Sequence, residues 1–161
     1  MSIKDVEVKF KKLNKDAVTP SYRYDGDAGF DLTLVEDLEI EPYGKGLGKT
    51  GLAFSIPEGY EAQIRPRSGI SLNGLEVICA NAEIVLITNS IDVILGTVDS
   101  NYRGEVGIIT KNNSEYKVTI PKGTRLAQMI VAPVVKILPK EVDELDSSER
   151  QEKGYGSTGV K

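Results

Sequence analysis

Short apolar stretches separated by turn signals run through most of the 161-residue chain. No long segment has the 3.6-residue spacing of apolar side chains that is typical of an amphipathic helix. Near the amino terminus Val6, Val8 and Phe10 alternate with Glu7 and Lys9, which is the two-residue period of a half-buried strand. Further strands are expected at residues 38–41, 51–56, 61–65, 75–80, 83–88, 91–95, 104–110, 116–120 and 127–138. So many short strands must pair all round or stack in two sheets to cover their edges, so the sequence predicts an all-β fold.

The composition limits the chemistry that the chain can perform. The chain has no histidine, which excludes Ser-His-Asp and Cys-His nucleophiles, HExxH metal sites and zinc deaminase centres that use histidine. Cys79 is the one cysteine, so neither a disulfide nor a thiolate zinc site can form within one chain. Its apolar neighbours in the sequence favour a buried, inert thiol. Acid–base chemistry must therefore rest on carboxylates, Lys or Tyr.

Charge and hydropathy narrow the choice of partners. The net charge of −4 argues against broad binding to a nucleic-acid backbone, although a few arginines could still bind a small polyphosphate. No apolar run approaches the ~18 residues of a membrane span. The amino terminus alternates charged with apolar residues, unlike a secretory signal. We therefore expect a cytoplasmic protein without a membrane or nucleic-acid partner.

The chain length suits one domain, and the amino-acid composition changes near the end of the chain. Residues 1–139 carry the strand pattern and are expected to form the β domain. Residues 140–161 are rich in charge, Ser and Gly, with little apolar surface, so a flexible carboxyl-terminal arm is expected there. Composition alone favours a solvated tail, yet this segment ends in the unusual sequence GYGSTG.

The sequence GKGLGKT at residues 44–50 superficially resembles a phosphate-binding loop. A Walker A loop needs four residues between its first glycine and the GK pair, and Tyr43 stands where that first glycine would have to be. No helix pattern follows. We therefore expect a turn between strands at residues 44–50.

Five other segments combine glycine with charged or hydroxyl side chains at expected turns or strand edges. They are AGFDL at 28–32, RPRSG at 65–69, GTVDSNYRG at 96–104, GTRLAQM at 123–129 and RQEKGYGSTG at 150–159. Each one taken singly has an ordinary structural explanation. Together, and in this order, they resemble the five motifs of the trimeric dUTP pyrophosphatase (dUTPase) family, and residues 51–53 and 56–60 extend the likeness.

The resemblance implies a jelly-roll-like β-barrel and a homotrimer with three shared active sites. It also implies Mg²⁺-dependent hydrolysis of dUTP to dUMP and pyrophosphate. A triphosphate carries about four negative charges, so Mg²⁺ and several guanidinium groups are suited to neutralise it while water attacks the α-phosphorus. By the same resemblance, Asp99 is the candidate general base and Asp31 lies near the water shell of the metal. The implied phosphate-binding residues are Arg67, Ser68 and Gly69. Gln128 would contact phosphate or an ordered water, and Arg125 is expected to be structural.

Base and sugar recognition are expected from the third and fifth motifs. Backbone groups around Leu95, Gly96 and Val98 can match the hydrogen-bonding edge of uracil, and a wrong base would leave buried polar groups unpaired. Tyr102 would pack on the deoxyribose and exclude a 2′-hydroxyl. The fifth motif would close over the nucleotide, with Tyr155 stacked on uracil and with further contacts from Arg150, Gly156, Ser157 and Thr158.

The chain departs from the usual motifs in several places, of which the exchange of Tyr and Phe at Phe30 and Tyr155 should matter little. Asn101 stands where an acid is usual, and Gln151 and Lys153 stand where glycines are usual. An extra segment at about residues 82–95 precedes the third motif, and residues 75–80 and 90–95 both remain candidates for the strand that leads into it. We expect residues 83–88 and 91–95 to form an added β-hairpin through Asn89 and Ser90, packed on the barrel or on a neighbouring subunit. This segment is also the candidate site for a protein partner.

Two alternatives share the same fold. A dCTP deaminase, or a bifunctional dCTP deaminase/dUTPase, is disfavoured because deaminases use a Glu beside the base, unlike the context of Asp99, and lack the GYGSTG arm. The other alternative is a nucleotide-sensing module that binds a protein partner without turnover.

Overall fold

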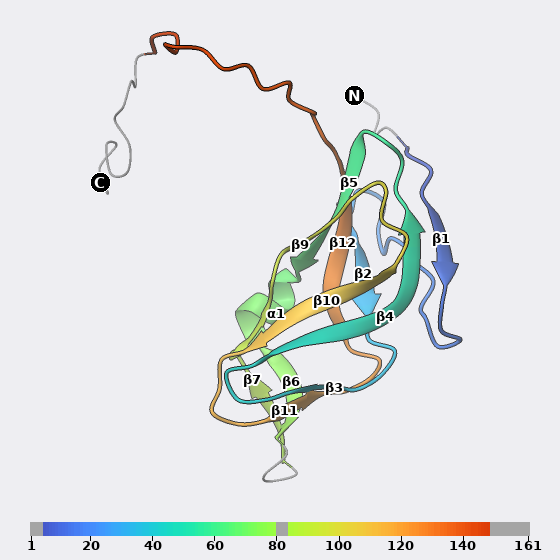
Figure 1. The fold of residues 1–161 in the computed structure, drawn as a ribbon. Coiled ribbons are helices and arrows are strands. Elements are labelled where there is room, and N and C mark those ends of the chain that lie inside the picture. The colour runs from blue at the N-terminus through green and yellow to red at the C-terminus, as the bar shows by residue number, and fades with distance from the viewer. Residues whose placement is uncertain (1–4, 80–83, 149–161) are drawn as a thin grey trace.

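The computed structural model describes residues 5–79 and 84–148, which are almost entirely β-structure (Figure 1). The strands are β1 (Lys9–Lys12), β2 (Phe30–Thr33), β3 (Leu38–Ile40), β4 (Lys45–Ser55), β5 (Tyr60–Pro66), β6 (Leu75–Cys79), β7 (Ile84–Thr88), β8 (Ile91–Val93), β9 (Gly96–Val98), β10 (Glu105–Asn112), β11 (Val118–Ile120) and β12 (Arg125–Pro133), and the short helix is α1 (Ser68–Asn73). Within the described residues the strands form three four-stranded sheets, ordered β1-β4-β10-β8, β3-β11-β6-β7 and β2-β12-β5-β9. The predicted all-β, jelly-roll-like fold is confirmed.

A single apolar core lies between the sheets. It forms because alternate residues of each strand point to the same face, as in β10, where Val106 and Ile108 are buried and Ile109 is exposed. Burying one such side chain stabilises the fold by about 1.5–3 kcal/mol. The largest fully buried side chains include Leu32, Leu34, Ile40, Ile56, Ile108, Ile120, Leu126 and Met129. Cys79 is buried with them as a free thiol, as predicted.

One polar side chain of the core, Asn112, joins three segments. Its amide nitrogen donates to the carbonyl oxygens of Ile40 (3.3 Å), Glu41 (3.1 Å) and Tyr116 (2.7 Å). Its amide oxygen accepts from the backbone N–H of Ser114 (2.9 Å). Asn112 is fully buried, so these bonds replace water for backbone groups that would otherwise be unpaired.

The expectation of a turn at residues 44–50 is wrong, because Lys45–Thr50 belongs to the long strand β4. Its glycines serve packing. A Cβ on Gly46 would come within 2.9 Å of the Leu38 side chain, and one on Gly48 within 2.6 Å of the Leu34 side chain. The glycines therefore let core leucines lie directly on the strand, a role that local sequence does not distinguish from a turn.

Other strand boundaries also differ from the expectation. The first strand begins only at Lys9, and all four of its residues are exposed. The Phe10 ring nevertheless packs near the Phe54 ring, with 6.3 Å between the two ring centroids. The helix α1 follows Arg67 in the second motif and was not expected, because six residues are too few to show a helical period. The last strand ends at Pro133 instead of residue 138.

The added hairpin is present, but its strands differ from those predicted. β6 pairs with β7 from Leu75 opposite Thr88 to Cys79 opposite Ile84, whereas β8 pairs with β10. The predicted pairing of 83–88 with 91–95 is therefore wrong. Burial explains the choice, because Ile91 and Val93 enter the core beside β10. β8 is the strand that leads directly into β9 and the third motif. Of the two candidate segments, residues 90–95 therefore hold this position and residues 75–80 do not.

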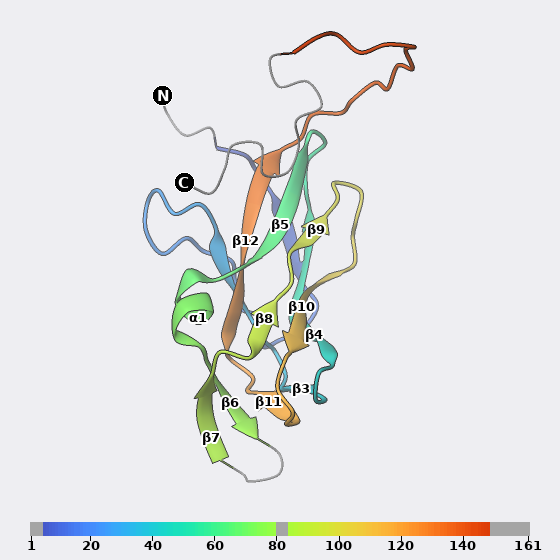
Figure 2. The same cartoon turned by 90° about the vertical axis from the view of Figure 1, so that its left-hand side faces the viewer.

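The two ends of the molecule differ in character. Figure 2 shows the β6–β7 hairpin and α1 toward one end, with the carboxyl-terminal segment leaving from the other. Residues 134–148 contain no helix or strand, and Val135 and Leu138 are 91% and 89% exposed. Within the described ranges, no helix has the length and apolarity that a membrane span requires.

Candidate functional site

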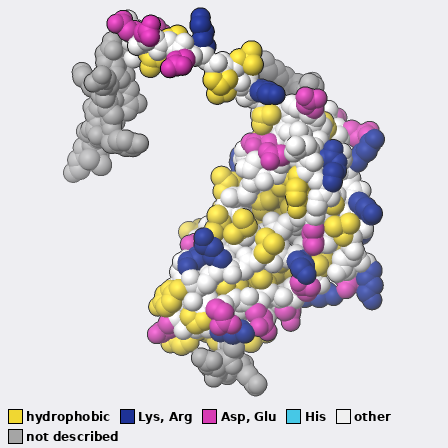
Figure 3. All heavy atoms as spheres, viewed as in Figure 1, with side chains coloured by type: hydrophobic (Ala, Val, Ile, Leu, Met, Phe, Trp, Pro, Cys, Tyr) yellow, Lys and Arg dark blue, Asp and Glu magenta, His cyan; other side chains and the backbone are white. Residues whose placement is uncertain are grey.

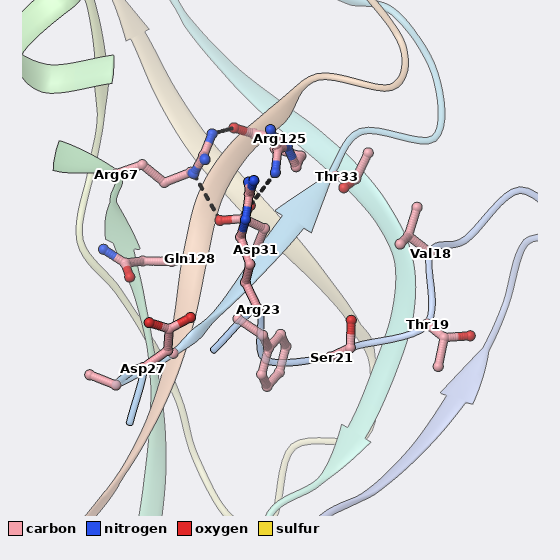
Figure 4. Close-up of a pocket in the computed structure, with 13 residues that line it drawn as sticks. Val18, Thr19, Ser21, Arg23, Asp27, Asp31, Thr33, Arg67, Arg125 and Gln128 are labelled. Carbon is pink, nitrogen blue, oxygen red and sulfur yellow. Dashed lines mark hydrogen bonds and ion pairs between the residues drawn. The ribbon is translucent and has the colours of Figure 1, made fainter. Parts of the chain in front are cut away.

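A pocket of about 500 Å³ lies where the loop of residues 18–28 faces strands β2 and β12 (Figure 4). Arg67, Arg125, Asp31 and Gln128 line it, so the first, second and fourth motifs meet there. Strand pairing explains the meeting. β12 lies between β2 and β5, with Gln128 opposite Asp31 on one side and opposite Arg65 on the other.

The Asp31 carboxylate binds two guanidinium groups. Oδ1 lies 2.8 Å from Arg67 Nε, and Oδ2 lies 3.2 Å from Arg125 Nη1. Arg67 Nη1 also donates to the carbonyl oxygen of Arg125 at 2.7 Å. The three side chains remain partly exposed, so these ion pairs contribute little to stability, about 0–1 kcal/mol each. Two guanidiniums around one carboxylate leave a net positive cluster, which suits an anionic ligand.

Gly29 allows the first motif to lie directly against β12. A Cβ at this position would come within 2.6 Å of the Met129 carbonyl oxygen and 2.7 Å of the Ile130 side chain. No side chain fits there without moving backbone. The glycine two residues before Asp31 thus fixes the distance between β2 and β12 at the pocket.

The remaining residues of the second motif surround the junction of β5 and α1. Ser68 and Gly69 are exposed, and a Cβ on Gly69 would have no neighbour within 4 Å. Gln128 Nε2 donates to the Pro66 carbonyl oxygen at 3.0 Å, which holds its side chain beside this junction. Backbone and hydroxyl groups here are open to a ligand that reaches the pocket.

The third motif lies elsewhere in the same chain. β9 pairs with the middle of β5, with Gly96 opposite Ile64 and Val98 opposite Ala62, so β9 runs away from the Pro66 end toward Asp99. Ala62 and Pro66 are four residues apart on that strand, roughly 13 Å at ~3.3 Å per residue. Figure 2 shows β9 beside β5 and α1 beyond the far end of that strand. Asp99 and the Asp31–Arg67 cluster therefore do not meet within one chain.

The turn after β9 has a defined local structure. The backbone N–H of Tyr102 donates to the carbonyl oxygen of Asp99 at 3.1 Å, and the Tyr102 hydroxyl donates to that of Glu105 at 3.0 Å. Asp99 is exposed, and Tyr102 is 46% exposed. Both side chains thus sit on the surface in a fixed turn, next to Gly96 and Val98. The predicted residues of the fifth motif, Arg150, Tyr155, Gly156, Ser157 and Thr158, lie outside the described residues.

Arg23 and Asp27 also line the pocket, and the motif analysis did not select them. They belong to the sequence YRYDGD, which directly precedes the first motif but has no strand or motif pattern of its own. The sequence feature that could have pointed to Arg23 is its position between two tyrosines in a turn.

The fold and the pocket define an all-β protein with an arginine-rich pocket. The chain matches the family described as dUTPase over residues 15–159. It is 44% identical to the deoxyuridine 5′-triphosphate nucleotidohydrolase of Alkaliphilus metalliredigens, over 96% of this chain and 98% of the relative. The protein of the same name from Hydrogenobaculum sp. is 45% identical over 94% of this chain and 96% of its own length.

Solved structures agree with these relatives. The dUTPase of Staphylococcus bacteriophage 80alpha with dUPNHPP has a TM-score of 0.80 and 31% identity, covering 96% of this chain and 99% of that one. A mutant dUTPase of the S. aureus phage phi11, described with a structural Mg(II) ion, has a TM-score of 0.71 and 25% identity, covering 86% of this chain and 98% of that one. The chain belongs to the dUTPase family.

Proposed function

We propose that the chain hydrolyses dUTP to dUMP and pyrophosphate. The observation that carries the proposal is the convergence of Asp31, Arg67 and Gln128, from three separate motifs, on one cationic pocket. Membership of the dUTPase family supplies the substrate.

Within this proposal, the phosphates bind at the junction of β5, α1 and β12. Arg67 supplies a guanidinium, Ser68 a hydroxyl, Gly69 its backbone N–H and Gln128 its amide. Charge-assisted hydrogen bonds of this kind are stronger than neutral ones. The exposure of Ser68 and the open space at Gly69 support direct contact with a ligand.

The residues present fit a Mg²⁺ ion that the nucleotide brings with it. In the described part of the chain, no three His, Cys, Asp or Glu side chains gather closely enough to hold a metal by themselves. Mg²⁺ usually keeps several waters and binds substrate phosphates with one or two carboxylates. Asp31 is the carboxylate proposed to bind its water shell, and the ion would supply charge neutralisation at the phosphates.

Asp99 is the proposed general base, accepting the proton of the water that attacks the α-phosphorus. A positioned base typically contributes about 10²–10⁴ in rate. The same turn carries the proposed nucleoside contacts. Backbone groups of Gly96 and Val98 would bind uracil, and the Tyr102 ring would pack on the sugar, for which its partial exposure leaves room.

A complete site then needs more than one copy of the chain, as a homotrimer with shared sites provides. The separation of Asp99 from Asp31 along β5 supports this assembly. Exposed apolar side chains also support it: Leu47, Leu95 and Ile109 are 61%, 61% and 41% exposed, with Ile109 opposite Leu47 in the β4–β10 pair. Figure 3 shows hydrophobic side chains on the side of the molecule where β4 and β10 face the viewer in Figure 1. A second copy is the occupant that would both cover these residues and bring Asp99 to the pocket.

The arm is proposed to carry the fifth motif over the nucleotide. Its first part supports this role, because residues 134–148 leave the body after β12 with several apolar side chains exposed (Figure 3). The division into a β domain and a carboxyl-terminal arm stays a prediction, and so does a protein partner at the added hairpin.

The deciding experiment incubates the protein with each dNTP and Mg²⁺, and measures pyrophosphate and ammonia. Pyrophosphate from dUTP alone is the expected result. Ammonia from dCTP would replace the proposal with the deaminase alternative, and tight nucleotide binding without turnover would replace it with a sensing module.

A further inference from the structure

A third arginine, Arg23, faces the Asp31 cluster from the opposite wall of the pocket. Figure 4 shows its side chain extending from the loop of residues 18–28 toward Asp31. We infer that Arg23 is a substrate-binding residue that contacts the β- and γ-phosphates, the part of dUTP that leaves as pyrophosphate. The inference rests on the proposed function.

Charge pairing separates Arg23 from the other two arginines. Arg67 and Arg125 are both engaged with Asp31. Among the described residues, Arg23 forms no ion pair, and its guanidinium lies over the Tyr24 ring, whose centroid is 5.6 Å from the guanidinium carbon. Within the part of the chain that the structure describes, Arg23 is thus the arginine of this pocket whose guanidinium has no carboxylate bound to it. A ligand with several negative charges is its natural partner.

The loop around Arg23 is tied down on both sides. Asp27 Oδ2 accepts from the backbone N–H of Tyr24 at 2.9 Å, and the Asp27 N–H donates to the Tyr24 carbonyl oxygen at 3.2 Å. On the other side, the Tyr22 ring packs edge-on against the Phe30 ring of β2, with 5.9 Å between the two ring centroids. Arg23 is therefore presented from an anchored turn, which lowers the entropy lost when it binds.

The charge distribution of the substrate points to the pyrophosphate end. The β- and γ-phosphates together carry about three of the four negative charges of the triphosphate, and charge also develops on this portion as it leaves. A guanidinium without a carboxylate partner is most useful there. Arg67 and the groups after it remain available for the α-phosphate side.

The test uses Arg23→Ala and Arg23→Gln in the full-length protein, with Lys49→Ala as the matched control. Lys49 is exposed on β4 and pairs with Glu36 at 3.2 Å, so its removal deletes one positive charge outside the pocket. KM and kcat are measured for dUTP, and inhibition constants are measured separately for pyrophosphate and dUMP. Melting temperatures verify folding.

For both Arg23 variants we expect KM for dUTP and the inhibition constant for pyrophosphate to rise about tenfold or more, since a charge-assisted bond is lost. The constant for dUMP should stay within about twofold and Lys49→Ala should resemble wild type. Unchanged pyrophosphate inhibition, or a loss confined to dUMP, would overturn the inference. Direct calorimetric binding of pyrophosphate keeps the test valid if wild type fails to hydrolyse dUTP, a result that would count against the proposed function alone.

Discussion

Arg125 contributes to the pocket through both its side chain and its backbone. Its guanidinium contacts Asp31 at 3.2 Å, and its carbonyl oxygen accepts from Arg67 at 2.7 Å. The Arg67 guanidinium is consequently held between the Asp31 carboxylate and the Arg125 carbonyl oxygen, and these two bonds fix its orientation. This geometry supports a positioning role for Arg125 and a ligand-binding role for Arg67, in line with the division expected from the motifs.

Two glycines of the motifs should respond differently to the same substitution. Gly29→Ala places a methyl group 2.6 Å from the Met129 carbonyl oxygen, so we expect a loss of about 1–3 kcal/mol of stability. Gly69→Ala meets open space in α1, where alanine is the better helix former, so its melting temperature should not fall. Its KM for dUTP should rise instead, because the methyl group obstructs the approach of a phosphate. Thermal melts and steady-state kinetics check both, and the reverse pattern would contradict these roles.

Individual elements show how far sequence patterns can predict this fold. Alternation predicted most strands, since half-buried strands repeat every two residues. It did not predict the strand character of residues 45–50, because Gly46 and Gly48 are there to admit leucines from other segments. The partner of β7 was also mispredicted, because Asn89 and Ser90 permit a tight turn while the burial of Ile91 and Val93 favours β10. Both errors arise from contacts distant in sequence.

Three residues that the motifs selected, Asp31, Arg67 and Gln128, line one pocket because their strands are neighbours. Their roles in binding stay predictions. Arg23 was missed because a single arginine in a turn carries no periodic signal. The distance of Asp99 from the other motifs depends on the register of β9 against residues 62–64 of β5, which no local pattern specifies.

Asn112 of β10 joins the end of β3 to the segment before β11 and offers a test of the fold that is independent of activity. Replacing it with leucine leaves the carbonyl oxygens of Ile40, Glu41 and Tyr116 without their donor. A buried group left unpaired costs about 1–3 kcal/mol, so the melting temperature should fall by several degrees. The kcat for dUTP at 25 °C should stay near wild type, since the residue is remote from the pocket motifs. A variant as stable as wild type would contradict this role.

At the scale of the whole molecule, the carboxyl-terminal arm should matter for turnover more than for stability. Deleting residues 153–161 removes the glycine-rich part of the fifth motif and none of the described core. We expect a sharp loss of turnover with little change in melting temperature. Because the chain has no tryptophan, Tyr155→Trp provides a reporter whose emission should change when a non-hydrolysable dUTP analogue binds. Full activity after truncation would contradict a role in turnover and would favour a solvated tail.

Each chain carries two parts of the proposed site that lie apart. The Asp31–Arg67 pocket lies beside the Pro66 end of β5, whereas Asp99 follows β9, whose Val98 lies opposite Ala62 of β5. The account therefore requires that Asp99 of one copy acts on a nucleotide bound by Arg67 of another, a requirement that can be tested by mixing inactive variants.

Asp99→Asn should fold and bind dUTP but turn over about 10²–10⁴ times more slowly, and Arg67→Ala should lose affinity for the phosphates. When the two variants are co-expressed in equal amounts, random assembly places an intact Asp99 opposite an intact Arg67 in about a quarter of the sites. We predict that the mixture recovers roughly that fraction of wild-type dUTP hydrolysis, while each variant alone does not. A mixture no more active than its parents would contradict a shared site, and an Asp99→Asn variant as active as wild type would remove Asp99 from the reaction.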